Sequence, residues 1–397
     1  MKKRYLFPLI TLLILSSCSN KKLIYSYNID PFGYNEQDKY FPCEILENGD
    51  IVKSNKLLYP FNTFIYIKSH IYESEKSEYE SVVLKAKEEI IRLSCLFDRH
   101  NYYVDKDNNL LKNLAYLNAN YGSSNYIELE KETYDLLKTG YELTLITEGK
   151  FNIFIGELTS LWDGYLKEGE NLPSQEDVLN AKNNVPTLEE LPYLIEFNDE
   201  EKSVKFNRLD NKEISITFGG IAKGRMTDLL YSILDDKRSI ISGGQSSIAT
   251  YGDSFYDAWT VAINNPKYND SKHYLTIDLK GKFSLSTSGD NQNYRIHDGV
   301  RYHHIINPFT GYPESYYRSC SLIGSNGTYL DALTTSLMLT PLNEVESFLN
   351  KIESVSKDNY NFVLINEDNN EITAYVNEEL KDLVETNEDT EMNIAFF

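Results

Sequence analysis

The stretch SLSTSGDNQNYRIHDGVRYHHIINPFTGYP, residues 284–313, packs hydroxyls, a carboxylate, an arginine and two adjacent histidines between turn signals. Two further blocks lie on either side of it in the chain, FGGIAKGRMTD at 218–228 and DALTTS at 331–336. Each of them puts small or hydroxyl residues at the start of an expected helix, where free backbone N–H groups and the positive dipole end favour phosphate oxygens. Together the three blocks predict a pocket for a phosphorylated ligand and a hard metal ion.

The glycine block is ambiguous by itself. Gly219 and Gly220 let the backbone approach a ligand closely, and Lys223 can meet an anion just as a helix opens. The spacing matches neither the phosphate-binding loop GxxxxGK followed by Ser or Thr, nor GxGxxG. A tight strand-to-helix turn with a solvated lysine explains the same residues.

Asp331 and Thr335 are four residues apart on an expected helix and therefore share one face. A carboxylate and a hydroxyl side by side are hard oxygen ligands that suit Mg²⁺, and Ca²⁺ would also accept them. The alternative is an N-terminal Asp favoured by the helix dipole and a Thr bonded back to its own helix.

Two adjacent histidines, His303 and His304, precede an apolar pair and a turn. Strand alternation sends their rings to opposite sides. His304 follows Thr287, Ser288 and Asp290 in the same block of sequence, 14 to 17 residues later, so we expect it to serve as an acid–base group, which is the chemistry that histidine most often performs. A structural histidine is the alternative.

Composition bounds the class of protein. The chain has 397 residues, 41% of them hydrophobic, which is enough for a core in one large or two ordinary domains. The formal net charge of −21 excludes a general binder of the nucleic-acid backbone, because such a protein needs a basic surface.

The N-terminus predicts export. Lys2, Lys3 and Arg4 precede an apolar run at 5–15, which is shorter than a membrane span and typical of a signal peptide at 1–17. Residues 15–18, LSSC, resemble the bacterial lipobox, which implies cleavage before Cys18 and a lipid on its thiol. An ordinary or uncleaved signal with a chance cysteine is the alternative. We expect an extracytoplasmic protein, lipid-anchored to the bacterial cell membrane.

The remaining cysteines, Cys43, Cys95 and Cys320, are odd in number and lack CxxC spacing, so they predict neither a disulfide framework nor a zinc site. One disulfide remains open. Residues 18–60 are polar and aperiodic and predict a tether with irregular structure.

Strand and helix patterns are interspersed from residue 61 onward, which predicts a mixed α/β fold. Helical spacing covers 75–96 and 130–148, and further helices are expected to start after Ser174 and near Lys223 and Asp331. Alternation or short apolar runs predict strands at 61–68, 213–217, 239–241, 259–264 and 274–279, and a closing hairpin at 362–365 and 371–376. An acidic tail at 385–397 is expected to fray.

The ordered motifs resemble the FAD:protein FMN transferase family, the ApbE-type flavin transferase lipoproteins, over residues 61–376. The motifs that carry the resemblance are GGIAKG with Asp228, Gly243-Gly244, Trp259 before Pro266, TSGD at 287–290, His304 with Pro308 and TGYP at 310–313, and DAL at 331–333 with Thr335. The resemblance implies a catalytic domain at 61–384, built as two closely packed lobes with the active site between them.

The family's known chemistry then implies roles for single residues. Mg²⁺ would be held by the backbone carbonyl of Ala222 and the side chains of Asp331 and Thr335, with the diphosphate of FAD on the metal. The cofactor-binding residues implied are Gly220, Lys223, Asp228, Thr287, Ser288 and Gly289. His304 would activate a Ser or Thr hydroxyl of a target protein, which takes FMN in phosphoester linkage and releases AMP.

The N-terminal half resembles the family more faintly, through LFDRHNY at 96–102, Asn118, GKFN at 149–152 and Leu161-Trp162. Tyr102 is our candidate to stack on the isoalloxazine ring, with Tyr103 beside it. Either tyrosine could equally be ordinary packing in a chain with 31 tyrosines.

Four departures each replace an Asp that is common in the family: Asn152, Thr217, Gln245 and Asn307. The leading hypothesis is a Mg²⁺-dependent transferase that flavinylates an exported redox protein of an electron-transfer system. The lost carboxylates keep open an FAD pyrophosphatase that makes FMN and AMP. A non-catalytic flavin-binding lipoprotein is a third reading.

Overall fold

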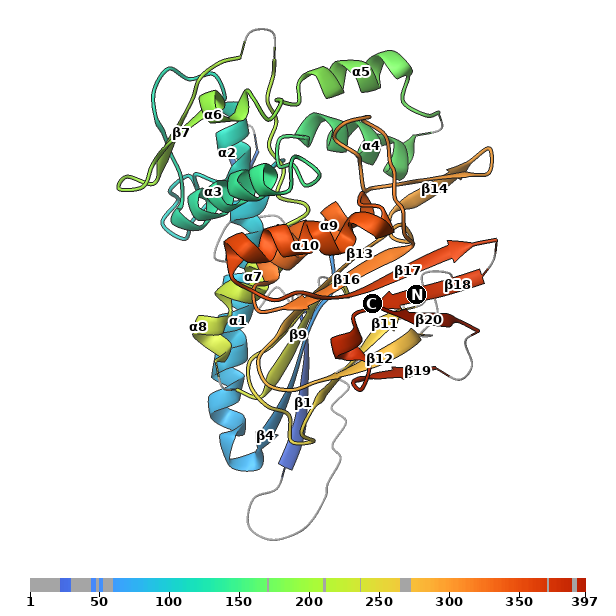
Figure 1. Cartoon of the computed structure of the whole chain (residues 1–397). Helices are drawn as coiled ribbons and strands as arrows, with labels where there is room; N and C mark the ends of the chain where they lie inside the picture. The colour runs from blue at the N-terminus through green and yellow to red at the C-terminus, as the bar shows by residue number, and fades with distance from the viewer. Residues whose placement is uncertain are drawn as a thin grey trace, which may run out of the picture.

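Nine strands of the described chain form one large sheet in the centre of the computed structural model (Figure 1). The structure describes residues 22–29, 44–47, 50–52, 60–169, 171–209, 212–235, 237–264, 273–369, 371–387 and 391–397. The strands, in spatial order, are β1 (Lys22–Ile29), β4 (Ile65–Tyr72), β9 (Ser239–Gly243), β10 (Ser247–Thr250), β13 (Ser284–Gly289), β16 (Ser319–Gly324), β17 (Asn361–Asp368), β18 (Glu371–Val376) and β20 (Asn393–Phe396). Neighbours are antiparallel except β18 and β20, which are parallel.

Both faces of the sheet are covered, which explains the unbroken buried run of β17. Phe362 and Leu364 pack against the helices α9 (Gly327–Met338) and α10 (Leu342–Ser356). Val363 and Ile365 point the other way, into a core shared with the small sheet of β11 (Trp259–Asn264), β12 (His273–Leu279) and β19 (Val384–Thr386). Alternation along one strand therefore supplies two separate cores.

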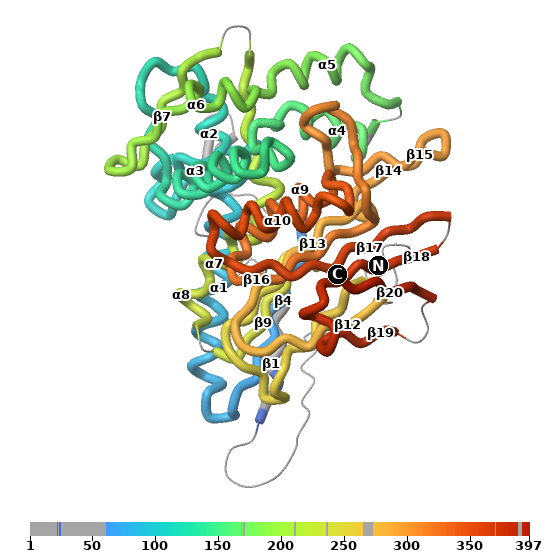
Figure 2. The backbone as a smooth tube through the Cα atoms, in the orientation of Figure 1, coloured from blue at the N-terminus to red at the C-terminus, as the bar shows by residue number. Residues whose placement is uncertain are grey.

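A mostly helical part lies above one end of the large sheet (Figures 1 and 2). Its helices are α2 (Leu114–Ala119), α3 (Lys131–Ile146), α4 (Gly156–Glu168), α5 (Gln175–Asn183) and α6 (Leu191–Leu194). Its strands are β6 (Ile127–Glu128), β7 (Ile195–Asn198) and β8 (Ser203–Phe206), with β5 (Tyr102–Val104) paired to β2 (Glu44–Glu47), which also pairs with β3 (Asp50–Val52). One hydrophobic cluster joins α1 (Lys76–Phe97) and α3 to Ile65, Ile67 and Ile241 of the sheet, so the two parts share a core.

The remaining elements connect these layers. They are α7 (Ala222–Leu229), α8 (Tyr231–Leu234), the hairpin of β14 (Tyr294–His297) and β15 (Val300–His303), and the 3-10 turns η1 (Pro60–Asn62), η2 (Glu73–Glu75) and η3 (Glu378–Leu380). No helix in the described part of the chain combines the length and the apolar character that a bilayer span needs.

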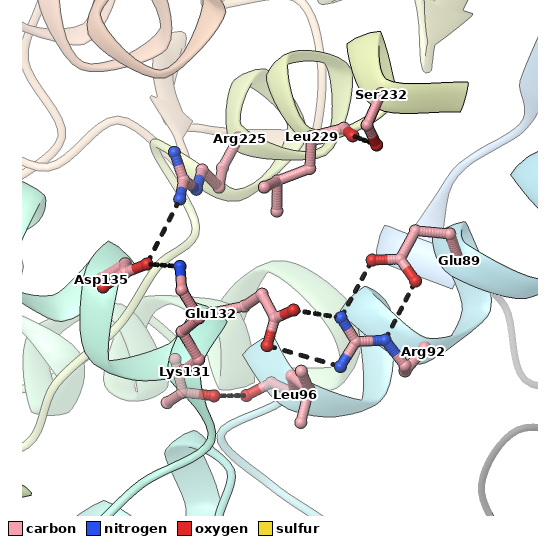
Figure 3. Close-up of polar contacts among 10 residues, drawn as sticks. Glu89, Arg92, Leu96, Lys131, Glu132, Asp135, Arg225, Leu229 and Ser232 are labelled. Carbon is pink, nitrogen blue, oxygen red and sulfur yellow. Dashed lines mark hydrogen bonds and ion pairs between the residues drawn. The ribbon is translucent and has the colours of Figure 1, made fainter. Parts of the chain in front are cut away.

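Ion pairs align α7 with α3 and α1 (Figure 3). Arg92 of α1 pairs with Glu89 at 2.9 Å and with Glu132 of α3. Asp135 of α3 pairs with Arg225 of α7 at 4.0 Å. Half-exposed pairs of this kind contribute at most about 1 kcal/mol each, so their main effect is to fix the direction of α7, whose first turn reaches the cavity described below.

The sequence predicted the long helices and several strands correctly. The helix expected at 75–96 is α1, that at 130–148 is α3, and Ser174 caps α5 by accepting a hydrogen bond from the Asp177 amide at 3.1 Å. Strands β9, β11 and β12 and the hairpin of β17 and β18 also lie where the patterns put them. These results confirm the mixed α/β class.

Other expectations are wrong. Strands β1, β2 and β3 fall in the segment that was expected to be irregular, and β19 and β20 fall in the tail that was expected to fray. Residues 213–217 form no strand, because only isolated bonds, such as that from the Thr217 amide to the Ile153 carbonyl at 2.8 Å, hold them beside the start of α4.

Residues 1–21, with the signal peptide and Cys18, lie outside the described residues.

The cysteines show one feature that the sequence left open. Cys95 is disulfide-bonded, and Cys320 is a free, buried thiol.

A buried histidine, His70, lies near the end of β4, outside the three sequence blocks at 218–228, 284–313 and 331–336. His70 is 3% exposed and stacks on Trp259 with ring centroids 4.7 Å apart. Its Nδ1 accepts a hydrogen bond from the Phe255 amide at 3.1 Å, so the proton of the neutral ring sits on Nε2. Burial, followed by the charges of Lys68 and Arg238, lowers the pKa of His70 to about 4.

This histidine predicts acid sensitivity. Between pH 6.5 and about 4 the unfolded chain binds a proton at His70 that the folded protein does not, so stability falls as pH falls through that window. At about 1.4 kcal/mol per pH unit, the loss approaches about 3 kcal/mol. Urea unfolding at pH 7 and pH 4.5 should show a smaller pH effect in His70→Gln, whereas His297→Gln, at a partly exposed position, should behave as wild type. Equal pH slopes in wild type and His70→Gln would refute the assignment.

Candidate active site

An open cavity lies where the helical part meets the end of the large sheet. Its empty space measures about 1120 Å³ when the open solvent at its mouth is included. The helical part contributes residues 150–152 and the α4 residues Thr159 and Asp163, and the sheet part contributes α9 and the end of β13. The full lining is Lys150, Phe151, Asn152, Ile155, Thr159, Asp163, Thr217, Gly219, Gly220, Lys223, Ser246, Thr287, Ser288, Gly289, Gln292, Asn293, His304, Ile305, Ile306, Asp331 and Thr335.

Asp331 is the buried carboxylate of this cavity. It lies in the second turn of α9, because the helix starts at Gly327 and not near Asp331 as the sequence suggested. Its Oδ2 accepts a hydrogen bond from the Gly224 amide at 2.6 Å, and its Oδ1 accepts one from the Ser247 hydroxyl at 2.7 Å. Burial raises the pKa of Asp331, while the nearby Lys223 charge and these hydrogen bonds oppose that rise. The carboxylate is therefore held in one orientation.

Hydroxyls surround Asp331. Thr335 donates to the Asp331 carbonyl at 3.2 Å, and its oxygen also lies 3.4 Å from the Ser288 hydroxyl. Ser288 on β13 donates to Thr334 at 3.0 Å. The serines of β13 occupy alternate positions, 284, 286 and 288, so the strand turns a polar row toward α9.

The donor set fits a hard cation. No group of three or more His, Cys, Asp or Glu side chains in the described residues could hold a metal, so any metal here needs hydroxyl or carbonyl oxygens as well. Asp331 and Thr335 both line the cavity, and the α7 first turn, which begins at Ala222, touches Asp331 through the Gly224 amide. Carboxylate, hydroxyl and carbonyl oxygens are the ligands that Mg²⁺ and Ca²⁺ prefer.

The contact between α7 and α9 depends on two glycines. A Cβ placed on Gly224 would lie 2.0 Å from the Gly327 carbonyl oxygen, closer than any real contact. The helices could make room only by moving apart, which would break the hydrogen bond from Gly224 to Asp331.

We therefore expect Gly224→Ala to lower stability by about 2–3 kcal/mol, as overpacking does, and to impair any metal binding at Asp331. Gly164→Ala in α4 is the matched control. Its Cβ meets nothing within 4 Å, so alanine there should be neutral or stabilising by up to about 1 kcal/mol. Chemical denaturation measures both variants, and equal stability of the two would contradict the close-contact argument.

His304 directly follows β15 and lines the same cavity as Asp331 of α9. Its Nδ1 is 3.0 Å from the Gln292 carbonyl oxygen, which can only accept, so Nδ1 carries the proton and Nε2 keeps a lone pair. Burial lowers the pKa of His304, and the charge of Lys223 lowers it further. The ring is therefore neutral at pH 7 and able to accept a proton.

His303 points away, as strand alternation predicted. It is buried, its Nδ1 accepts a hydrogen bond from the Ile305 amide at 3.2 Å, and it lines a second cavity together with Asp290 and Arg301. Burial lowers the pKa of His303 to about 3. One histidine thus faces each cavity.

Most of the predicted ligand contacts line the same cavity: Gly220, Lys223, Thr287, Ser288, Gly289, His304, Asp331 and Thr335. Thr287 shares a hydrogen bond with Ser321 at 2.8 Å. The Lys223 ammonium makes no hydrogen bond or ion pair with any described residue, so its charge is available to an anion.

Asp228 and Tyr102 are placed elsewhere. Asp228 caps α9, because its carboxylate accepts hydrogen bonds from the amides of Gly327 and Thr328, both at 2.8 Å. Tyr102 belongs to the β2–β5 ladder opposite Leu46. Neither residue lines the cavity. Asp228 positions the helix that carries Asp331, and its expected contact with the nucleotide stays a prediction. Ala222 is buried at the start of α7 and does not line the cavity either.

Two of the four departures from the family pattern line the cavity. Asn152 accepts a hydrogen bond from the Phe154 amide at 2.8 Å, and Thr217 accepts one from the Gly219 amide at 3.2 Å. Gln245 and Asn307 lie outside it. The neutral side chains therefore replace charge at two places on the cavity wall.

Sequence reasoning missed Lys150 and Asp163 as lining residues. Lys150 donates to Thr340 at 3.0 Å, and it stands within the GKFN motif, which was a usable signal. Asp163 is a carboxylate on a helix with other charges, which gave no signal.

Comparison with known proteins places the chain in a family. The model of the ApbE family matches residues 79–357. A Vibrio cholerae protein named FAD:protein FMN transferase is 29% identical over 224 residues, which cover 55% of this chain and 63% of that protein. Its Escherichia coli namesake is 28% identical over 214 residues, which cover 52% of this chain and 58% of that protein. The match thus spans less than two thirds of either relative.

Solved structures share the fold. The crystal structure of the ApbE protein of Thermotoga maritima superposes with a TM-score of 0.62 at 24% identity, covering 83% of this chain and 94% of that one. The apo form of Pseudomonas stutzeri flavinyl transferase ApbE gives 0.64 at 17% identity, covering 93% and 98%.

Proposed function

The chain belongs to the ApbE family, and we propose that it is an FAD:protein FMN transferase that attaches FMN to a Ser or Thr of a target protein and releases AMP. The relatives that carry this name support the proposal. The observation that carries it is the pairing, across one cavity, of a neutral histidine with a free Nε2 and a buried carboxylate among hydroxyls.

The reaction needs one proton transfer and one displacement. The acceptor hydroxyl gives its proton to Nε2 of His304 while its oxygen forms a bond to the flavin-side phosphorus. The bond from that phosphorus to the bridging oxygen breaks, and AMP leaves with that oxygen. Lys223, whose ammonium has no partner among the described residues, would hold the diphosphate in place.

Asp331, Thr335 and the Ala222 carbonyl would hold Mg²⁺. The ion, when bound, would neutralise negative charge that develops on the diphosphate. The chain's own contribution is orientation, because Gly224 and Ser247 already fix both oxygens of Asp331.

The proposal includes a location and a partner. A lipobox-like Cys18 supports lipid anchoring outside the cytoplasm, and the acceptor would be an exported flavoprotein of an electron-transfer system. The disulfide at Cys95 also supports an oxidising compartment.

Incubation with FAD, Mg²⁺ and an exported flavoprotein acceptor tests the transfer. Intact-protein mass spectrometry should show one FMN increment on a Ser or Thr, with one AMP released per increment. Tight FAD binding without any increment, across several acceptors, would reject the proposal.

A second candidate is hydrolysis of FAD to FMN and AMP, with water in place of the protein hydroxyl. The neutral Asn152 and Thr217 on the cavity wall favour it. Free FMN in stoichiometry with AMP, produced equally with and without acceptor, would establish it.

A further inference from the structure

The hairpin of β14 and β15 supplies both partners of the bond that sets the His304 tautomer. Gln292 lies just before β14, and His304 follows β15 directly. The hydrogen bond between them therefore closes the base of the hairpin. The hairpin stands beside α4, beyond the end of the large sheet (Figures 1 and 2). The contacts of the hairpin with its neighbours therefore determine the position of the Gln292 carbonyl.

One face of the hairpin rests on α4. Arg295 donates to the carbonyls of Leu166 at 2.8 Å, Lys167 at 2.9 Å and Gly169 at 2.8 Å, at the C-terminal end of that helix. Tyr302, opposite Arg295 in the ladder, stacks on Trp162 at 5.7 Å. These contacts hold the middle of the hairpin.

The base of the hairpin is fastened by Asp290, on the other face. Its Oδ1 lies 3.1 Å from Arg318 Nε, and its amide donates to the Arg318 carbonyl at 3.0 Å, directly beside the start of β16. Its Oδ2 lies 3.9 Å from Nε of Arg301 on β15, and Arg301 also donates to the Asp290 carbonyl at 3.4 Å. One carboxylate thus ties the returning strand of the hairpin to the large sheet.

We propose that Asp290 is a positioning residue for catalysis: by clamping Arg301 to Arg318 it fixes the Gln292 carbonyl, and through it the His304 tautomer with Nε2 free. The catalytic meaning of this clamp rests on the transferase proposed above. Asp290 is buried and touches neither the active-site cavity nor His304, so it acts through the chain between residues 290 and 292 and through Arg301 on β15.

Proton transfer to His304 is sensitive to a small displacement of the Gln292 carbonyl. If the Gln292 carbonyl moves out of hydrogen-bond range, nothing in that contact keeps the proton on Nδ1. The ring can then carry its proton on Nε2, and in that form Nε2 cannot accept the hydroxyl proton. Misplacement of a catalytic group by about 1 Å can cost up to about 100-fold in rate.

The buried charge is consistent with this role. An ion pair taken out of water is seldom a source of net stability, and an apolar replacement of the same shape is often as stable. The Asp290 carboxylate forms ion pairs with Arg301 and Arg318, and the Asp290 backbone adds the directional contacts, because its amide donates to the Arg318 carbonyl and its carbonyl accepts from Arg301.

Nitrogen NMR of ¹⁵N-histidine-labelled protein tests the clamp directly, because protonated and unprotonated ring nitrogens have distinct shifts. Loss of the signal in His304→Gln assigns it. Wild type should show the Nδ1–H form, and Asp290→Asn should show a mixture of both forms. With FAD and acceptor, Asp290→Asn should lose about tenfold in kcat with KM for FAD unchanged.

Two further variants sharpen the test. Glu367→Gln removes the other partner of Arg318, at 3.1 Å, and leaves Asp290 in place, so it should match wild type in both measurements. Arg301→Gln removes one arm of the clamp at a partly exposed site, so it should fold and shift the tautomer in the same direction; it carries the test if Asp290→Asn does not fold.

A pure Nδ1–H signal in both Asp290→Asn and Arg301→Gln would overturn the proposal. A raised KM with unchanged kcat would also overturn it, since that would mean contact with FAD. The NMR comparison needs no substrate, so it tests whether Asp290 sets the His304 tautomer even if the wild-type protein transfers no FMN.

Discussion

Asp331→Ala is expected to reduce Mg²⁺-dependent AMP release from FAD by about 100-fold or more. Asp331 is the one carboxylate that lines the cavity from α9, and it supplies the negative charge of the expected metal site. Its removal also leaves the Gly224 amide and the Ser247 hydroxyl without their acceptor, at a cost of about 1–3 kcal/mol for each buried group. The measurement is AMP formation by the chain from residue 19 onward, with and without Mg²⁺.

Folding must be separated from chemistry in this test. Asp331→Asn keeps the side-chain volume and should lose nearly as much activity while it melts closer to wild type. Asp358→Ala removes a carboxylate that accepts from Ser325 and from the Asn359 amide, outside the cavity, and should stay fully active. AMP release by Asp331→Ala within threefold of wild type would place the metal, or the reaction, elsewhere.

His304→Gln should lower kcat for FMN transfer by about 10²–10³, with little change in KM for FAD, because a proton acceptor is lost and FAD contacts are not. The glutamine amide can still donate to the Gln292 carbonyl, so the loop should keep its place. His297→Gln, at a partly exposed position of the same hairpin, is the control, and single-turnover kinetics provide the measurement.

The pH profile gives this prediction a second measurement. His304 works as the neutral base, and its pKa is lowered by burial and by Lys223, so wild-type kcat/KM should stay level from pH 7 down past 6.5 and fall only at lower pH. The acid limb should vanish in His304→Gln. A wild-type limb centred above pH 6.5, or one that persists in the variant, would show that another group takes the proton.

Local patterns were sufficient where the structure is locally determined. The helical spacing of α1 and α3 and the alternation of β11 appear in the chain itself, so their positions were predicted within a few residues. Strand β1 was missed because its place depends on pairing with β4, more than 30 residues later. Leu23, Tyr25, Tyr27 and Ile29 alternate with mainly polar residues, which is a strand signal, but alternation alone does not say which strand β1 pairs with.

The site was predictable where one motif supplies one role. His304, Asp331 and Thr335 follow from motifs and meet at one cavity. Asp228 could not be interpreted, because the helix that it caps starts 99 residues later at Gly327. That same cap, with Asn326 accepting from the Tyr329 amide at 3.0 Å, starts α9 one turn before Asp331. Tyr102 was chosen from many tyrosines by sequence position alone, and position does not report a three-dimensional neighbour.

With a lipid anchor at Cys18, as proposed above, the direction of β1 would set the distance between the cavity and the membrane. Lys22 pairs with Tyr72 at one end of the strand, while Ile29 pairs with Ile65, which itself pairs with Gly243 near the cavity. Eight residues of extended chain span about 25 Å. With an anchor at Cys18, four residues before Lys22, the bilayer would lie under the end of the sheet opposite the cavity. An acceptor would then have to raise its Ser or Thr by about that distance to be reached.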